Sequence, residues 1–118
     1  MNILIKFNDL KESAAIENYA LEKLSEASNA LKDDTARMEV EIGKNNKHHH
    51  SGQQYILKLT LKKKGKDIHI EAISDDIYNS IDIAKNKLEQ EISSKKDREL
   101  TLFKRGAQKI KNMLKFNN

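Results

Sequence analysis

The chain has 118 residues, with 22 lysines and arginines against 18 aspartates and glutamates, a formal net charge of +4, and neither cysteine nor proline. This length allows one domain with a modest hydrophobic core, and the lack of cysteine excludes disulfide frameworks and thiolate metal sites. No apolar run approaches the roughly 18 residues of a membrane span, and the N-terminus does not follow the basic-then-apolar pattern of a signal peptide, so we expect a soluble, cytoplasmic protein.

The first part of the chain predicts a strand, a helix and a second strand. Residues 2–7 are strongly β-forming and place their large apolar side chains on one face. Asp9, followed three residues later by Glu12, resembles a capping box and predicts a helix that reaches about Leu31. Residues 37–42 then alternate between apolar and polar side chains, as in a half-buried strand. The buried stripe predicted for the helix is Ile16, Ala20, Leu24, Ala27 and Leu31, with Tyr19 beside it.

The middle of the chain predicts two more strands. Residues 43–53 read as a polar loop, and residues 55–62 alternate as a third strand. A tight turn follows, in which Gly65 can take a positive φ angle. Residues 67–73 alternate as the last strand. These strands and their loops hold seven lysines and no acidic residue between Lys44 and Lys66.

Ser74–Arg98 reads as a long helix. Either Ser74 or Asp75 is the expected N-cap, with Asp76 adding negative charge to the first turn. Its apolar positions recur every three or four residues and define one narrow stripe that ends at Ile92. The helix is therefore expected to lie on a core up to that residue and to extend beyond it. The stripe consists of Ile77, Ile81, Ala84, Leu88 and Ile92.

These elements predict an α+β fold with the order β-α-β-β-β-α and a basic C-terminal tail. The first strand, helix and second strand would form a right-handed crossover, which makes strands one and two parallel. The remaining strands would continue as antiparallel hairpins, giving a four-stranded mixed sheet with both helices on one face. Residues 1–98 would form the domain and residues 99–118 a basic amphipathic extension.

The sequence offers no catalytic constellation and no metal site. His69 is expected to point outward from a strand, and the three consecutive residues His48–His50 are poorly placed to converge on one ion. Asp75 and Asp76 are explained by helix capping, and Asp82 by a contact with Lys85 one turn later. A metal-dependent hydrolase that uses His48–His50 is the enzyme alternative. We expect a protein that is not an enzyme and has no cofactor.

The charge distribution favours an anionic partner. Residues 95–118 carry a net charge of +6, whereas residues 1–94 carry −2. Such a gradient is typical of a surface that contacts nucleic acid, although lysines at strand edges also discourage aggregation. With only six aromatic residues, phosphate contact is a better expectation than base stacking. The candidate RNA-binding residues are Lys23, Lys62, Lys63, Lys64, Lys66, Lys85, Lys87, Lys95, Lys96, Arg98, Lys104, Arg105, Lys109 and Lys111.

The last helix carries a family resemblance. Residues 75–98 read D-D-I-Y-N-S-I-D-I-A-K-N-K-L-E-Q-E-I-S-S-K-K-D-R, which resembles the D-x-Y-x-A-I-D…K-L-x-x-Q-L…K-x-K signature of ribosome hibernation-promoting factors and ribosome-associated translation inhibitors. The chain departs from that pattern at Ser80, Glu91 and Ser94. No second domain follows, so the chain resembles the short form of the family. The matching residues are Tyr78, Ile81, Asp82, Lys87, Leu88 and Lys96, with Tyr19 and Lys23-Leu24 on the first helix.

The resemblance implies a binding protein for the small ribosomal subunit. It would bind near the decoding region, contact ribosomal RNA and obstruct messenger and transfer RNA in resting or stressed cells. It would be a monomer off the ribosome, with no small-molecule substrate and no membrane partner. Whether it promotes or prevents ribosome pairing stays open. The alternative is a free double-stranded-RNA-binding domain, but such domains run α-β-β-β-α, and the extra first strand argues against it.

The tail, residues 99–118, combines helical spacing of apolar residues with five cations. It could continue the long helix, fold back on the sheet, lie on a membrane surface or dock on RNA. Membrane binding is the weaker interpretation, because one short apolar face without tryptophan offers little anchorage. Gly106 lowers helix propensity, so an isolated tail is expected to be marginally helical.

Overall fold

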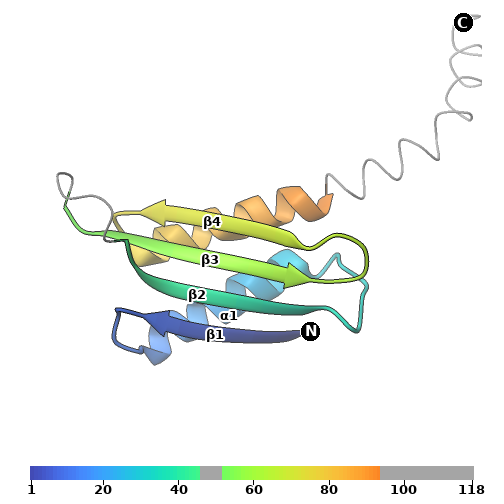
Figure 1. The fold of residues 1–118 in the computed structure, drawn as a ribbon, viewed down its shortest axis with the longest axis horizontal. Coiled ribbons are helices and arrows are strands. Elements are labelled where there is room, and N and C mark those ends of the chain that lie inside the picture. The colour runs from blue at the N-terminus through green and yellow to red at the C-terminus, as the bar shows by residue number, and fades with distance from the viewer. Residues whose placement is uncertain (46–51, 94–118) are drawn as a thin grey trace, which may run out of the picture.

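The computed structural model of the chain describes residues 1–45 and 52–93, which form two layers (Figure 1). Within them, one sheet consists of β1 (Asn2–Asn8), β2 (Arg37–Asn45), β3 (Gln54–Lys62) and β4 (Ile68–Ser74). Helix α1 (Ala14–Ser28) connects β1 to β2, and a second helix over residues 77–93 follows β4. The predicted α+β class and the order β-α-β-β-β-α are confirmed.

The strand order in the sheet is β1-β2-β3-β4. β1 runs parallel to β2, because the chain crosses over through α1 between them, and the β2–β3 and β3–β4 pairs are antiparallel. Gly65 in the β3–β4 turn has a φ of 84°, the left-handed conformation expected for it. The sheet is therefore mixed, as predicted.

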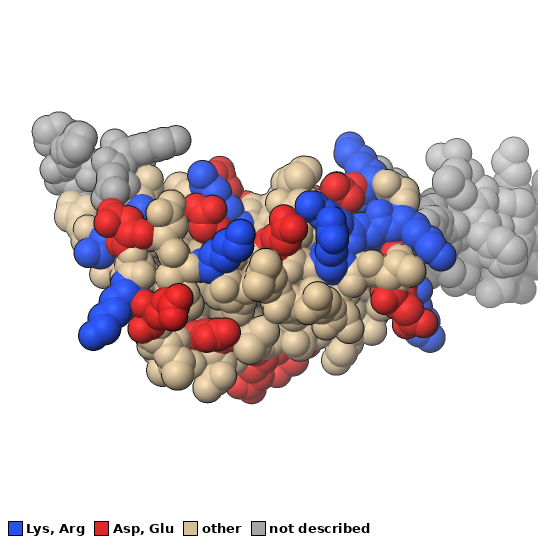
Figure 2. All heavy atoms as spheres, turned by 60° about the horizontal axis from the view of Figure 1, so that its bottom comes forward, with Lys and Arg blue, Asp and Glu red and all other residues tan. Residues whose placement is uncertain are grey.

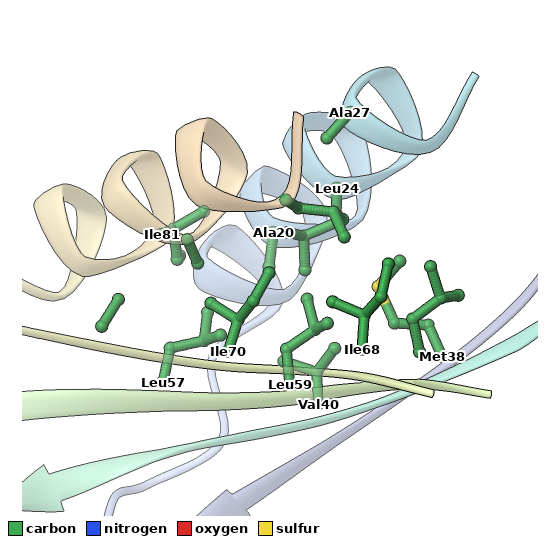
Figure 3. Packing of buried hydrophobic residues seen from close by; sticks show 14 of the residues in the cluster. Ala20, Leu24, Ala27, Met38, Val40, Leu57, Leu59, Ile68, Ile70 and Ile81 are labelled. Atoms are coloured by element: carbon green, nitrogen blue, oxygen red, sulfur yellow. The ribbon is translucent and has the colours of Figure 1, made fainter. Parts of the chain in front are cut away.

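Both helices pack on the same face of the sheet, and apolar side chains fill the space between the layers (Figure 3). Because strand side chains alternate between faces, every second residue points into this core, as Met38, Val40 and Ile42 do from β2. The apolar stripe predicted for the second helix is buried along its whole length, Ile92 included. The helix therefore contacts the core as far as the sequence predicts.

Both helices begin later than expected. Helix α1 starts at Ala14, not near Asp9, because the Ser13 hydroxyl accepts a hydrogen bond from the Ile16 amide at 3.3 Å and caps it. Asp9 instead takes a φ of 54°, which turns the chain out of β1. The N-cap of the second helix is Asp76, whose carboxylate accepts from the Tyr78 amide at 2.9 Å.

Strand β1 is an edge of the sheet and is the least buried strand. Its inward side chains, Ile3, Ile5 and Phe7, are only partly buried. At its end Asn8 pairs with Gly43, which lies in β2 and not in the predicted loop. A Cβ atom on Gly43 would lie 2.2 Å from the Asn8 carbonyl oxygen, so only glycine allows the two strands to approach this closely.

The outer face of the sheet is not covered by the described helices. Lys6, Glu41, Lys58 and Glu71 lie opposite one another in one row across all four strands. Their charges alternate in sign, so the middle of this face has little net charge. Of the helices that the structure describes, none is long and apolar enough to span a membrane.

Candidate nucleic-acid interface

A basic surface lies at the end of the sheet where β2 begins and β3 ends. Antiparallel pairing places Arg37 opposite Lys62, and the β3–β4 turn follows at once with Lys63 and Lys64. Figure 2 shows several blue lysine and arginine side chains gathered at the right-hand end of the visible face, whereas blue and red side chains are interspersed at the left. These residues surround a hollow of about 430 Å³ whose lining is Thr35, Arg37, Lys62, Lys63, Lys64 and Asp67.

Asp33 holds the walls of this hollow in place. Its carboxylate accepts hydrogen bonds from the Thr35 hydroxyl at 2.6 Å and the Thr35 amide at 3.0 Å, and from the Lys64 amide at 2.9 Å. The hydrogen bond from the Thr35 hydroxyl, followed by the one from the Lys64 amide, lowers the pKa of Asp33 to about 2. Asp33 therefore ties the loop before β2 to the β3–β4 turn through an ionised carboxylate.

Replacing Asp33 with asparagine is expected to lower stability at neutral pH and to remove part of its pH dependence. Because the pKa of the folded state, about 2, lies below the ordinary value of 3.8, the carboxylate stabilises the fold above pH 3.8. That contribution is lost as the pH falls through about 2. Urea midpoints of the wild type and Asp33→Asn should therefore differ at neutral pH and converge in acid. A constant difference at every pH would contradict the assignment.

The lysines of this surface differ in their availability. Lys62 pairs with Glu39 across the sheet at 3.3 Å, and both side chains stay more than a third exposed. Such a pair is weak and readily exchanged for another anion. Lys63 donates to the Lys64 carbonyl at 3.2 Å, whereas Lys64 and Lys66 are exposed.

The helix lysines are bound into the fold. Lys85 pairs with Glu26 of α1 at 3.1 Å and with Glu89 at 3.5 Å, and the hydrogen bond that its ammonium donates to Glu26 raises the pKa of Lys85. The predicted contact between Lys85 and Asp82 is wrong, because Lys85 pairs with these two glutamates and Asp82 accepts from Tyr19. Lys87 donates to the Glu71 carbonyl of β4 at 2.8 Å.

Two signature residues of the second helix, Tyr78 and Asp82, join it to α1. The Tyr19 hydroxyl donates to Asp82 at 2.6 Å, which raises the pKa of Tyr19 to about 12. The Tyr19 and Tyr78 rings meet edge to face, with their centroids 5.0 Å apart. The Lys23 ammonium lies 5.4 Å from the Tyr19 ring centroid, within cation–π range. These residues therefore stabilise the contact between the helices.

The structure thus brings only part of the predicted set together. Lys62, Lys63 and Lys64 line one hollow, while Lys23, Lys85 and Lys87 are held on the helices. Arg37 was not among the predicted RNA-binding residues. The predicted hairpin could have identified Arg37, because the start of the second strand must lie beside the lysine-rich end of the third strand. Seven predicted residues lie outside the described part of the chain: Lys95, Lys96, Arg98, Lys104, Arg105, Lys109 and Lys111.

Residues 1–45 and 52–93 contain no cluster of side chains that could bind a metal ion. No group of three or more histidine or acidic side chains in these ranges could hold an ion. His69 is exposed on β4, as predicted, and its Nδ1 atom lies 3.2 Å from the Thr60 hydroxyl. His48–His50 lie outside the described residues.

Comparison with known proteins matches this chain to a family. The sequence model of the family described as sigma 54 modulation protein / S30EA ribosomal protein matches residues 3–99. No curated protein matches the chain.

Two solved structures share the fold. The N-terminal domain of Thermus thermophilus Protein Y aligns with a TM-score of 0.64 and 22% identity, covering 78% of this chain and 96% of that one. A ribosomal subunit interface protein from Coxiella burnetii aligns with a TM-score of 0.66 and 23% identity, covering 82% and 99% respectively. At these identities the likeness establishes the fold alone.

Proposed function

Because the chain belongs to the sigma 54 modulation protein / S30EA ribosomal protein family, as its resemblance to the hibernation factors predicted, we propose that it is a ribosome-associated translation inhibitor. It binds the small ribosomal subunit near the decoding region and obstructs messenger and transfer RNA in resting or stressed cells. The family match over residues 3–99 is the observation that carries this proposal. The protein acts in the cytoplasm by binding and not by catalysis, without a cofactor, and is a monomer off the ribosome.

The distribution of charge supports an RNA partner. The outer face of the sheet alternates in sign, whereas Arg37 and the lysines after β3 concentrate positive charge at one end. The second helix reaches the same end, since Ile92 lines a second hollow there together with Lys63 and Lys64. The sequence then continues with Lys95, Lys96 and Arg98. A footprint of this kind binds phosphates through counterion release.

A free double-stranded-RNA-binding domain fits the fold less well. Those domains run α-β-β-β-α, whereas β1 here precedes α1 and pairs in parallel with β2. A bare RNA duplex therefore serves as the control ligand in the test of the proposal.

The proposal predicts co-sedimentation of the purified protein with small ribosomal subunits at low salt. Binding should weaken steeply as salt rises, because each phosphate that is neutralised releases counterions. Large subunits and the bare duplex should retain much less protein at the same salt concentration. Failure to sediment with the small subunit at low salt refutes the proposal, and equal affinity for the duplex favours the alternative.

A further inference from the structure

Arg37 carries hydrogen-bond donors for which the described part of the chain supplies no acceptor. It begins β2 on the outer face of the sheet, between Asn2 of β1 and Lys62 of β3. It is the sole arginine within the described ranges, and it is exposed. Its guanidinium makes no hydrogen bond or ion pair with any other residue that the structure describes. Five N–H donors of a permanently charged group therefore face solvent at the hollow.

The acidic groups near Arg37 are largely occupied. Glu39 faces the same side of the sheet but pairs with Lys62 at 3.3 Å. Asp33 accepts its hydrogen bonds from Thr35 and from the Lys64 amide. Of the residues that line the hollow, Asp67 alone is acidic, against one arginine and three lysines. The hollow therefore keeps an excess of positive charge.

The chemistry of these donors selects a phosphate. A guanidinium presents two parallel N–H groups that match two oxygens of a phosphate, whereas a lysine ammonium acts as a point charge. The Thr35 hydroxyl donates to Asp33 and so has no hydrogen to offer an anion. We propose that this hollow binds one backbone phosphate of ribosomal RNA, with Arg37 as its bidentate ligand and the lysines around it as supporting charges.

The site is formed before the ligand arrives. Asp33 fixes both Thr35 and the turn at Lys64, which line the hollow. The Arg37 backbone is fixed by its strand partners on both sides. Less conformational freedom is therefore lost on binding than at a site whose backbone is not fixed in this way. This inference rests on the proposed function and assigns one contact within it.

The test compares Arg37→Ala and Arg37→Lys with Lys58→Ala in the full-length chain. Lys58 is the matched control, because it is an exposed cation on the same face, but it lies between Glu41 and Glu71. Affinity for small ribosomal subunits is measured over a salt series, and urea unfolding checks each fold. Arg37→Ala should weaken binding about fivefold to tenfold and reduce the slope of log affinity against log salt by about one phosphate contact.

Arg37→Lys should keep the salt slope of the wild type but still lose affinity, because the charge remains and the two-point contact does not. Lys58→Ala should change neither affinity nor slope. Equal binding by Arg37→Ala and Lys58→Ala overturns the phosphate site while the proposed function stands. Wild-type affinity for Arg37→Lys overturns the bidentate contact. A wild-type protein that does not bind subunits overturns the proposed function itself, and the site with it.

Discussion

Replacing Gly43 with alanine is expected to destabilise the protein by about 2–3 kcal/mol, a large part of the roughly 5–15 kcal/mol that holds a small domain together. The added Cβ atom would lie 2.2 Å from the Asn8 carbonyl oxygen and 3.2 Å from its carbonyl carbon. Both are backbone atoms, so no side-chain rotation relieves the clash. β1 must move away from β2, and the half-buried side chains of β1 lose their packing. Urea unfolding measures the loss.

Gly52→Ala provides the matched control for Gly43→Ala. Gly52 has a φ of 78° and no atom within 4 Å of a built Cβ, so alanine there costs about 1–2 kcal/mol of backbone strain and no contact. Gly43 has no positive φ, so its cost is entirely steric. Should Gly43→Ala prove no less stable than Gly52→Ala, β1 would have to yield more easily than its pairing suggests.

Removing residues 99–118 is expected to weaken small-subunit binding by about tenfold or more and to leave the domain folded. The fold should survive because the buried stripe of the second helix ends at Ile92. The deleted segment carries five cations and one acid, Glu99. The slope of log affinity against log salt should fall by about 0.7–0.9 for each phosphate contact that is lost. Subunit sedimentation over a salt series measures binding, and thermal unfolding measures stability.

A full-length variant separates charge from chain length in this experiment. Glutamine at all five cationic positions of the tail should reproduce the loss of affinity and the flatter salt dependence of the truncated chain. If the truncated protein unfolds, the apolar residues of the tail belong to the hydrophobic core. If affinity and the salt slope stay unchanged, the cations of the tail only face solvent and do not contact the ribosome. The five positions that the glutamine variant replaces are Lys104, Arg105, Lys109, Lys111 and Lys115.

The layers of this fold could be predicted because periodicity reports burial directly. A stripe that stops at Ile92 can only be the face of a helix that lies on a core, and the structure buries every residue of it. Parallel pairing of β1 and β2 followed from the handedness of a strand-helix-strand crossover. These features depend on many residues at once, so no single local choice could reverse them.

Helix starts were less predictable, because several neighbouring residues can cap. Asp9 offered a capping side chain, but the chain turns sharply there and the helix begins after Ser13. Asp76 similarly caps the second helix, since β4 continues as far as Ser74. For the second helix the end of the preceding strand decides which polar residue lies at the helix terminus, and that position depends on pairing with another strand.

The candidate site was predictable as a region and not as a set of contacts. The run of lysines in the sequence indicated that the β3–β4 turn belongs to the basic surface, because charge can be read from the sequence directly. Which lysines are occupied depends on residues distant in the chain, such as Glu26 for Lys85. Arg37 stands alone among acidic and apolar neighbours in the sequence, and only the strand register joins it to Lys62.

The parallel pairing of β1 also has a kinetic consequence. Each residue of β1 pairs with one that lies beyond α1, as Asn2 does with Arg37, whereas β3 and β4 are joined by a short turn. Closing the longer loop costs more chain entropy before any contact is gained, so β1 is expected to join the sheet late in folding. Damage to this strand, including that at Gly43, should then speed unfolding more than it slows folding. The lifetime of the folded state would thus be governed by the strand that contributes least to its core.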